Sequence, residues 1–313
     1  MLSRRGMMLA LTGAGLAGAT ALAGCSREFG EVIGIGQKVA EIVRRHGGRV
    51  GVSLTSGSGD ANSNFSIQSD QRFAMCSVFK WVLAAAVLQA VDQGKLKVSQ
   101  EVAYTKADLL EYAPVTTQHV TKGRMTIGDL CSAAVAVSDN TAANLLLPLI
   151  GGPAGLTAFV RGLGDTTTRF DRNEPTLNDV VDGDERDTTT PAAMTQLLKT
   201  VFTGTVLKPA SLSLLKDWMV ATTTGKNRIP AGVPAGYVVG HKTGTAGVHA
   251  NDVAVIWPAG GKAPLFLSIF TTGGKLDDAG RDKVIADLTR VVFEVLAFAE
   301  EVSKSKTSSS ASS

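Results

Sequence analysis

The feature that most constrains the fold of this chain is the placement of strand patterns at both of its ends, with a helical stretch between them. Apolar, strand-like runs occur at residues 49–54 and 64–67, and again at residues 236–239, 252–256 and 264–270. The chain from about residue 76 to 221 is mainly helical in pattern. Strands from both ends must pair to bury their apolar faces. The sequence therefore predicts an α+β fold: an antiparallel sheet flanked by N- and C-terminal helices, with an inserted all-α domain.

Two helical patterns border these strands, at residues 33–46 and 279–302, where apolar residues recur at helical spacing. The Ser/Lys-rich end of the chain is too polar to fold by itself. The expected division has five parts: a signal peptide at residues 1–24, a tether at 25–32, a sheet domain formed by 33–75 and 222–302, a helical domain at 76–221, and a disordered tail at 303–313.

The N-terminus has the layout of a secretory signal, because Arg4 and Arg5 precede an apolar run and small residues lead to Cys25. Residues 22–25, Leu-Ala-Gly-Cys, resemble a bacterial lipobox, in which Cys25 would be acylated and become the new N-terminus. We therefore expect an exported, periplasmic protein that is tethered to the membrane as a lipoprotein. Cleavage nearby without lipid is the alternative, and the paired arginines leave general or twin-arginine export open.

Composition and charge narrow the class of protein. The chain has 313 residues, of which 44% are hydrophobic and 19% charged, and its formal net charge is +3. No basic run supports nucleic-acid binding. The four histidines lack metal-binding spacings, so neither a metal nor a cofactor is expected. Cys76 and Cys131 are expected to be free structural thiols, unless the fold pairs them in an oxidising compartment. The expected assembly is a monomer.

A serine and a lysine open the most apolar helical stretch. Ser77 and Lys80 are three residues apart, and residues 81–88 contain neither Gly nor Pro. Positions i and i+3 share a helix face, so the hydroxyl and the amine would lie together as a nucleophile and a base. Burial would push the lysine toward its neutral form. The same spacing recurs by chance at residues 213–216 and 303–306, and a helix-capping role for Ser77 is the alternative.

A polar break follows the helix that begins near Thr126. At Ser138-Asp139-Asn140, Ser138 could pass a proton and Asn140 could hold a substrate amide. A turn between two helices explains these small polar residues equally well.

A long stretch at residues 162–190 has little periodicity, and structureless segments of that length inside a domain are usually functional. Glu174 precedes Pro175, so this bond can be cis at low cost, and the carboxylate could activate a water. Arg172 and Asp187 have opposite charges near the two ends of the stretch and could clamp it.

The stretch His241-Lys242-Thr243-Gly244-Thr245 ends a predicted strand. Alternation places Lys242 and Gly244 on one face, and Thr243 and Thr245 on the other. Gly244 permits the close approach of a ligand, and Lys242 could anchor a carboxylate. A lysine at a strand end is nevertheless most often solvated.

Taken together, these stretches resemble the class A serine β-lactamases. That family is marked by Ser-x-x-Lys, Ser-Asp-Asn and Lys-Thr-Gly, which begin here at Ser77, Ser138 and Lys242 in the same order. Residues 174–178 match a fourth, class-defining element, and the likeness covers residues 33–299. The resemblance implies a hydrolase that opens the amide of penicillins and cephalosporins and so confers β-lactam resistance.

The resemblance implies a role for each matching residue. Ser77 would form an acyl-enzyme, with the backbone N–H groups of Ser77 and Thr245 as the oxyanion hole, and Ser138 would relay a proton to the leaving nitrogen. Either Lys80 or Glu174 would activate Ser77, and Glu174 would activate the deacylating water. The residues implied in holding the substrate or that water are Tyr112, Asn140, Asn178, Arg228, Lys242, Thr243, Gly244 and Thr245.

The chain departs from the family pattern at several positions. His241 stands where an aspartate is usual. Cys131 occupies a disulfide position whose partner here is Ala84. Cys76 resembles a cysteine that carbapenem-hydrolysing relatives pair with one after the Lys-Thr-Gly strand, where this chain has Ala246. The last difference puts carbapenem hydrolysis in doubt.

Two alternatives come from other classes of protein. A penicillin-binding D,D-peptidase shares the Ser-x-x-Lys chemistry, but residues 174–178 argue against it. A non-catalytic lipoprotein on the same fold should lack at least one reacting residue, and all four are present: Ser77, Lys80, Ser138 and Glu174. Substrate range and the response to inhibitors stay open at the level of sequence.

Overall fold

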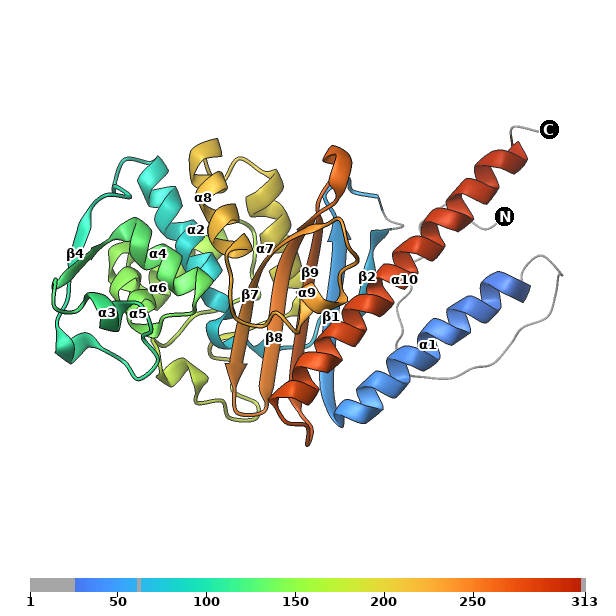
Figure 1. The fold of residues 1–313 in the computed structure, drawn as a ribbon, viewed down its shortest axis with the longest axis horizontal. Helices are drawn as coiled ribbons and strands as arrows, with labels where there is room; N and C mark the ends of the chain where they lie inside the picture. The colour runs from blue at the N-terminus through green and yellow to red at the C-terminus, as the bar shows by residue number, and fades with distance from the viewer. Residues whose placement is uncertain (1–25, 61–62, 311–313) are drawn as a thin grey trace.

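The computed structural model describes residues 26–60 and 63–310 of the chain. A five-stranded antiparallel sheet lies at the centre, with a group of helices on one side and two long helices on the other (Figure 1). The predicted α+β class and antiparallel sheet are therefore confirmed. The predicted signal peptide and Cys25 lie outside the described residues.

The strands are β1 (Gly48–Ser56), β2 (Phe65–Ile67), β3 (Phe73–Ala74), β4 (Glu101–Ala103), β5 (Arg124–Thr126), β6 (Thr188–Thr189), β7 (Val238–Ala246), β8 (His249–Trp257) and β9 (Leu265–Gly273). The α-helices are α1 (Ser26–His46), α2 (Phe79–Asp92), α3 (Thr116–His119), α4 (Ile127–Ala136), α5 (Asn140–Leu146), α6 (Gly152–Gly162), α7 (Pro191–Thr203), α8 (Pro209–Val220), α9 (Ile229–Gly232) and α10 (Asp278–Ser310). Short 3-10 turns include η2 (Cys76–Val78), η3 (Lys106–Asp108), η4 (Leu147–Ile150), η5 (Thr176–Asn178) and η6 (Ala259–Gly261).

The main sheet joins the two ends of the chain. Its strand order is β2-β1-β9-β8-β7, and every neighbouring pair is antiparallel. Strand β1 pairs with β9 along its whole length, from Gly48 opposite Gly273 to Ser56 opposite Leu265. The N-terminal hairpin is thus part of the same sheet as the C-terminal strands, as the strand patterns at both ends of the sequence predict.

Both faces of this sheet are buried. In β8, Val253 and Val255 belong to the apolar cluster on the helical side, whereas Ala254 and Ile256 belong to the cluster under α1 and α10. Alternate residues of a strand point to opposite faces, so a sheet covered on both sides needs strands that are apolar throughout. This requirement explains why residues 253–257 of β8 are all apolar and residues 265–270 of β9 are apolar except for Ser268.

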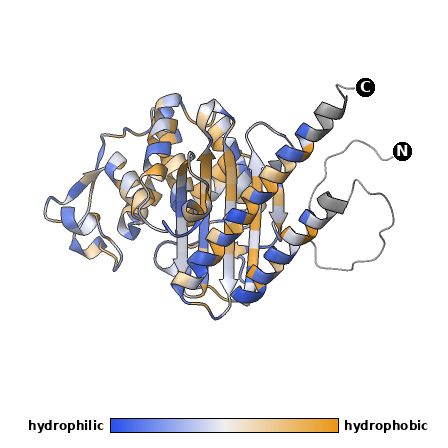
Figure 2. Cartoon of the chain, turned by 45° about the vertical axis from the view of Figure 1, so that its right-hand side comes forward, coloured by the Kyte–Doolittle hydropathy of each residue, from blue (hydrophilic) through white to orange (hydrophobic). Residues whose placement is uncertain are grey.

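Helix α2 forms the centre of the helical side. Every residue from Phe79 to Leu88 is buried, including Lys80, which matches the absence of a polar face in this stretch. On the opposite side of the sheet, α1 and α10 lie side by side, and the apolar strands appear behind them (Figure 2). In α1, Ile35, Val39 and Ile42 form the buried stripe.

Several elements have limits that differ from the predicted ones. Helix α1 begins at Ser26, within the expected tether at residues 25–32. Strand β7 runs from Val238 to Ala246 and so includes the stretch 241–245 that was predicted to end a strand, because each of its residues has a partner on β8. The final helix was predicted to end at residue 302 before a disordered tail, but α10 continues to Ser310. Lys304 lies one turn from Glu300, and adding residues to an existing helix costs far less than nucleating one.

The division into a sheet domain and a helical domain stays a prediction.

Within residues 26–60 and 63–310, no single helix is long and apolar enough to cross a membrane. The segment α5–η4 together with α6, bent by 70° at Gly151, has the necessary length and apolar composition only as a pair.

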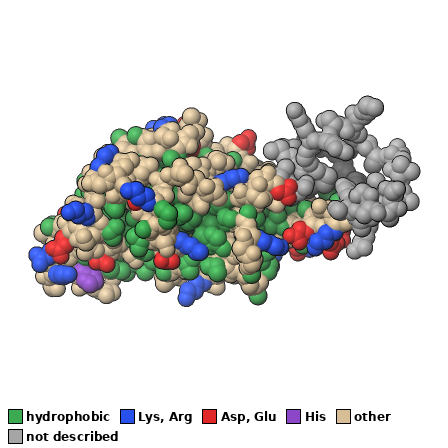
Figure 3. All heavy atoms as spheres, turned by 90° about the horizontal axis from the view of Figure 1, so that it is seen from above, with side chains coloured by type: hydrophobic (Ala, Val, Ile, Leu, Met, Phe, Trp, Pro, Cys, Tyr) green, Lys and Arg blue, Asp and Glu red, His purple; other side chains and the backbone are tan. Residues whose placement is uncertain are grey.

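The face seen from above carries scattered charged side chains of both signs, with hydrophobic side chains between them (Figure 3).

Candidate active site

Ser77 and Lys80 meet where the turn η2 runs into α2. Lys80 Nζ donates a hydrogen bond to Ser77 Oγ at 3.0 Å. The capping residue of α2 is Val78, with no side-chain hydrogen bond to the helix end. The helix-capping alternative for Ser77 is therefore wrong, and its hydroxyl instead contacts an amine, as the spacing predicts.

A carboxylate from a distant loop reaches the same two groups. Ser77 Oγ lies 3.2 Å from Glu174 Oε1, and Lys80 Nζ lies 3.0 Å from the same oxygen. The side chains of Lys80 and Glu174 are fully buried. Asn178 donates to the other oxygen, Glu174 Oε2, at 2.7 Å. A hydroxyl, an amine and a carboxylate are thus within hydrogen-bonding distance of one another.

The loop that presents Glu174 is fastened at its base. Arg172 Nε lies 2.6 Å from Asp187 Oδ2, and Asp187 Oδ1 accepts hydrogen bonds from the backbone N–H groups of Asp171 and Arg172. The predicted clamp between Arg172 and Asp187 is confirmed. The Glu174–Pro175 bond is cis, the form that the sequence allows at low cost.

Asn144 is a residue of this site that the sequence analysis missed. Its amide nitrogen donates to the carbonyl of Glu174 at 2.8 Å, and its amide oxygen accepts from the N–H of Glu174 at 3.0 Å. Asn144 lies four residues after Asn140 on α5, so the two side chains share one helix face. That spacing is a signal that could have identified it.

Ser138 lies in the break between α4 and α5, with a left-handed backbone at φ 64°. Its neighbour Asp139 caps α5 by accepting from the N–H of Ala142. Lys80 Nζ donates to the Ser138 carbonyl at 2.8 Å and to Asn140 Oδ1 at 2.5 Å. The predicted turn is present, and its side chains also line the catalytic cluster.

Strand β7 lies against the Ser77 turn and Ser138. Lys242 is fully buried, and its Nζ donates to Ser138 Oγ at 3.0 Å and to the Thr243 carbonyl at 2.8 Å. The reading of Lys242 as a solvated strand-end lysine is therefore wrong. A Cβ on Gly244 would lie 2.3 Å from the carbonyl oxygen of Met75, so only glycine lets β7 approach the Ser77 turn this closely.

Arg228 reaches Thr245 near the end of β7. Its Nη2 donates to Thr245 Oγ1 at 2.7 Å, its Nη1 donates to the Gly244 and Asn251 carbonyls, and its Nε pairs with Asp282 at 2.6 Å. Arg228 is thus placed beside Thr245, one of the residues that the resemblance implies in substrate binding.

Two lysines in this cluster are held toward their neutral forms. Burial lowers the pKa of Lys80, and the nearby Glu174 carboxylate partly offsets this effect. The pKa of Lys242 lies well below its usual value, because of burial first and then of the positive charge on Lys80. Lys80 and Lys242 approach Ser138 Oγ to 3.4 and 3.0 Å, so a proton can pass between these groups.

Cys76, next to Ser77, has a left-handed backbone at φ 47°. Burial raises the pKa of its thiol to about 12. Cys76 and Cys131 are both free and buried, which confirms the prediction of unpaired thiols.

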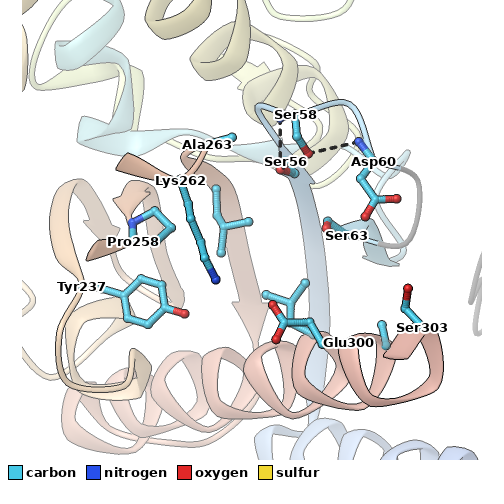
Figure 4. A pocket seen from close by; sticks show the side chains of 13 residues that line it. Ser56, Ser58, Asp60, Ser63, Tyr237, Pro258, Lys262, Ala263, Glu300 and Ser303 are labelled. Atoms are coloured by element: carbon cyan, nitrogen blue, oxygen red, sulfur yellow. Dashed lines mark hydrogen bonds between the residues drawn. The ribbon is translucent and has the colours of Figure 1, made fainter. Parts of the chain in front are cut away.

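Tyr112 and a separate surface hollow lie outside the Ser77–Lys80–Glu174 cluster. Tyr112 has a half-exposed side chain, and its carbonyl accepts from the N–H of Asn140 at 3.0 Å. A separate hollow of about 320 Å³ lies between the β1–β2 loop and α10, lined by residues that include Tyr237, Lys262 and Glu300 (Figure 4). None of the predicted site residues lines it.

The described residues were also compared with the ligand sets that hold metal ions. Within residues 26–60 and 63–310, no group of three or more His, Cys, Asp or Glu side chains is placed to hold a metal ion.

Comparison with known families gives a match over most of the chain. A family model described as the beta-lactamase enzyme family matches residues 35–296. Beta-lactamase SME-1 of Serratia marcescens is 45% identical over 253 residues, which cover 80% of this chain and 84% of the relative. The carbapenem-hydrolyzing beta-lactamase KPC of Klebsiella oxytoca is 43% identical over 265 residues, which cover 84% and 89%.

Solved structures give the same result. An ancestral class A beta-lactamase is 50% identical, with a TM-score of 0.79 over 83% of this chain and 99% of the other. A beta lactamase from Xanthomonas campestris pv. campestris is 45% identical, with a TM-score of 0.80 over 84% and 97%. Sequence and architecture thus agree over nearly the whole of these proteins, and the chain belongs to the beta-lactamase enzyme family, in its class A.

Proposed function

We propose that this β-lactamase hydrolyses the amide of penicillins and cephalosporins through an acyl-enzyme on Ser77, which water activated by Glu174 then cleaves. The observation that carries this proposal is the convergence on Ser77 Oγ of Lys80 Nζ, at 3.0 Å, and Glu174 Oε1, at 3.2 Å. A serine hydroxyl is a weak nucleophile until an adjacent base accepts its proton. Two candidate bases lie within that distance.

In the acylation step, Ser77 Oγ attacks the lactam carbonyl as its proton passes to Lys80, or to Glu174, which hands it on to Lys80 at 3.0 Å and is free again as a base for deacylation. The C–N bond then breaks, and Ser138 gives its proton to the departing nitrogen. Ser138 can regain a proton from Lys80 or Lys242, since both amines lie within hydrogen-bonding distance of its hydroxyl. The backbone N–H groups of Ser77 and Thr245 would stabilise the oxyanion.

In the deacylation step, Glu174 takes a proton from water, and the hydroxide attacks the acyl carbon. The Ser77–acyl bond breaks, and the proton returns to Ser77 Oγ. Asn178, at 2.7 Å from Glu174 Oε2, fixes the orientation of the carboxylate and helps to hold the water. Asn144 holds the Glu174 backbone from the other side.

Substrate binding uses the rim of the same cluster. Lys242, Thr243 and Thr245 would bind the substrate carboxylate, with Arg228 behind Thr245. Asn140 would bind the acylamide side chain, while Gly244 allows the ligand to approach the backbone and Tyr112 forms a wall of the cleft. The Arg228 guanidinium favours an anionic substrate, whose charge would in turn favour the protonated form of Lys242.

The acyl-enzyme is tested by intact-mass measurement. Glu174→Ala protein mixed with a penicillin is expected to gain the mass of the drug and to keep it, because deacylation has lost its base. Its kcat should fall about 10²- to 10⁴-fold. Ser77→Ala is the matched control and should gain no mass. Loss of the adduct from Glu174→Ala at the wild-type rate would contradict the role of Glu174.

The same mass measurement distinguishes a β-lactamase from the D,D-peptidase alternative. A D,D-peptidase would retain the penicillin adduct in the wild-type protein as well. The direct contact between Glu174 and Ser77 favours turnover, so the wild type should return to its unmodified mass. An assay with a penicillin, a cephalosporin and a carbapenem would then define the substrate range, which the unpaired Cys76 leaves open for carbapenems.

We also propose that the protein is exported to the periplasm and anchored there by a lipid on Cys25. The support is the signal layout of residues 1–24 and the lipobox-like residues 22–25. Cys25→Ala is expected to move the protein from the membrane fraction to the soluble periplasmic fraction. A wild-type protein that is already soluble would show that the anchor is absent.

A further inference from the structure

A buried histidine–aspartate pair lies behind the substrate-binding strand. His241 Nδ1 is 3.0 Å from Asp252 Oδ1 and 3.1 Å from Asp252 Oδ2. The Asp252 side chain is fully buried, and that of His241 is 3% exposed. A carboxylate in such a position needs hydrogen-bond donors to offset the loss of water. The His241 ring is one donor, and the backbone N–H of Ile229 at 3.1 Å is another.

The His241–Asp252 pair is linked to Arg228 through the backbone. Ile229, whose N–H binds Asp252, directly follows Arg228 at the start of α9. The Arg228 guanidinium then binds Thr245 Oγ1 and the carbonyls of Gly244 and Asn251. A short chain of contacts therefore leads from the His241 ring, through Asp252 and one peptide unit, to the guanidinium beside Thr245.

The direction of the side chain keeps His241 away from the reacting groups. His241 and Lys242 are consecutive on β7, so they face opposite sides of the sheet. Lys242 points to Ser138, whereas His241 points to Asp252, on the side where Arg228 and Asp282 lie. His241 can therefore influence the reaction only through the groups that it holds.

We propose that His241 and Asp252 are positioning residues, which hold the start of α9 so that Arg228 stays beside Thr245 and the substrate carboxylate is bound. This inference rests on the proposed function, in which Thr245 and Arg228 serve that carboxylate. Disturbing the pair weakens substrate binding and leaves the acyl-transfer chemistry at Ser77 intact.

The first test compares two replacements of His241. His241→Leu removes the donor, and we expect KM for a penicillin to rise roughly 5- to 20-fold, the value of one to two hydrogen bonds, with kcat within about twofold. His241→Asn places an amide N–H near the position of Nδ1, and its KM should stay within about threefold of the wild type. Ile256→Val, in the same buried sheet but outside this network, controls for general destabilisation.

The second test is a double-mutant cycle. If His241 acts through Arg228, His241→Leu should add no further increase in KM to an Arg228→Gln protein. Should His241→Leu fail to fold, Asp252→Asn replaces it in both experiments with the same expectations, because it keeps the shape of the side chain.

Three results would overturn the proposal. These are an unchanged KM in the donor-less variant, an equal KM increase in His241→Asn, and an increase in KM that persists undiminished in the Arg228→Gln background. Failure of the proposed function would look different, because wild-type protein would then form no Ser77 adduct with a penicillin.

Discussion

At the scale of single residues, the site places charged groups where water cannot reach them. Lys242 is fully buried, and within the described part of the chain no carboxylate lies within salt-bridge distance of it. Its hydrogen bonds go to a hydroxyl and a carbonyl. An ammonium in such a place is unfavourable for folding, which agrees with the proposed role of Lys242 in binding the substrate carboxylate.

This reasoning predicts opposite effects of Lys242→Met on stability and activity. Removing the buried ammonium should stabilise the protein by about 1–3 kcal/mol near pH 7, measured by chemical denaturation, while kcat/KM falls at least about tenfold. The folded-state pKa of Lys242 is lowered, so the unfolded chain binds more protons and the wild type gains stability as pH rises toward the usual lysine value. The advantage of the variant should therefore shrink at alkaline pH. A variant less stable than wild type at every pH would contradict this account.

At the scale of elements, the catalytic loop depends on a clamp and not on secondary structure. Apart from the single turn η5, residues 171–187 contain no helix or strand, yet Glu174 is buried within them. Asp187 holds one end of the loop through Arg172 and two backbone N–H groups. The loop is ordered because its polar groups are satisfied by one another.

Asp187→Asn tests the clamp with little change of shape. Asp187 has a left-handed backbone at φ 55°, which asparagine also tolerates, so the variant loses mainly the charge. We expect a loss of about 1–3 kcal/mol in the free energy of unfolding and slower deacylation, because Glu174 is held less firmly. Rapid-mixing kinetics should show a larger fall in the deacylation rate than in the acylation rate. Arg186→Gln, which changes the ion pair of the exposed Arg186 with Asp184 outside the clamp, is the control, and an equal fall in both rates would contradict the prediction.

At the scale of the whole molecule, the two long helices α1 and α10 are joined by ion pairs of Glu294 and of the less exposed Asp287. Asp287 on α10 pairs with Arg45 of α1 and with Lys283 and Arg290 of its own helix. Burial opposes ionisation of Asp287, but hydrogen bonds from Lys283 and Arg45 outweigh it and hold the pKa of Asp287 below its usual value. This group therefore helps to close the N-terminal helix onto the end of the chain.

Because the folded-state pKa of Asp287 is lowered, its contribution to stability depends on pH. A carboxyl with a lowered folded-state pKa stabilises the protein above its unfolded value, about pH 4, and loses that contribution as pH falls through the folded value. Asp287→Ala should therefore lower the melting temperature at pH 7, and the difference from wild type should narrow toward pH 3. Asp278→Ala, an exposed carboxylate at the start of the same helix, should show a smaller effect. A difference that is constant between pH 7 and pH 3 would contradict the role of the charge.

Much of the fold and of the candidate site could be predicted because the signals are local. Helical spacing brings Ser77 to Lys80, and alternation separates the two faces of β7. The strand patterns at both ends indicate a shared sheet. Local signals could not show the register in which β7 pairs with β8, because that register depends on contacts between the two strands. Nor could they show Asn144 beneath Glu174 or His241 against Asp252, which are contacts between distant segments.

The order of the residues is enough to identify the reactive groups of this protein and the elements that hold them, because periodicity, Gly and Pro placement and residue chemistry act over a few neighbours. The distances between those groups and their charge states depend on the packed fold. Ser77 meets Glu174 across 97 positions of sequence, and Lys242 meets Ser138 across 104. Those distances and the burial that shifts the pKa values arise only when the helices and the sheet pack together and exclude water.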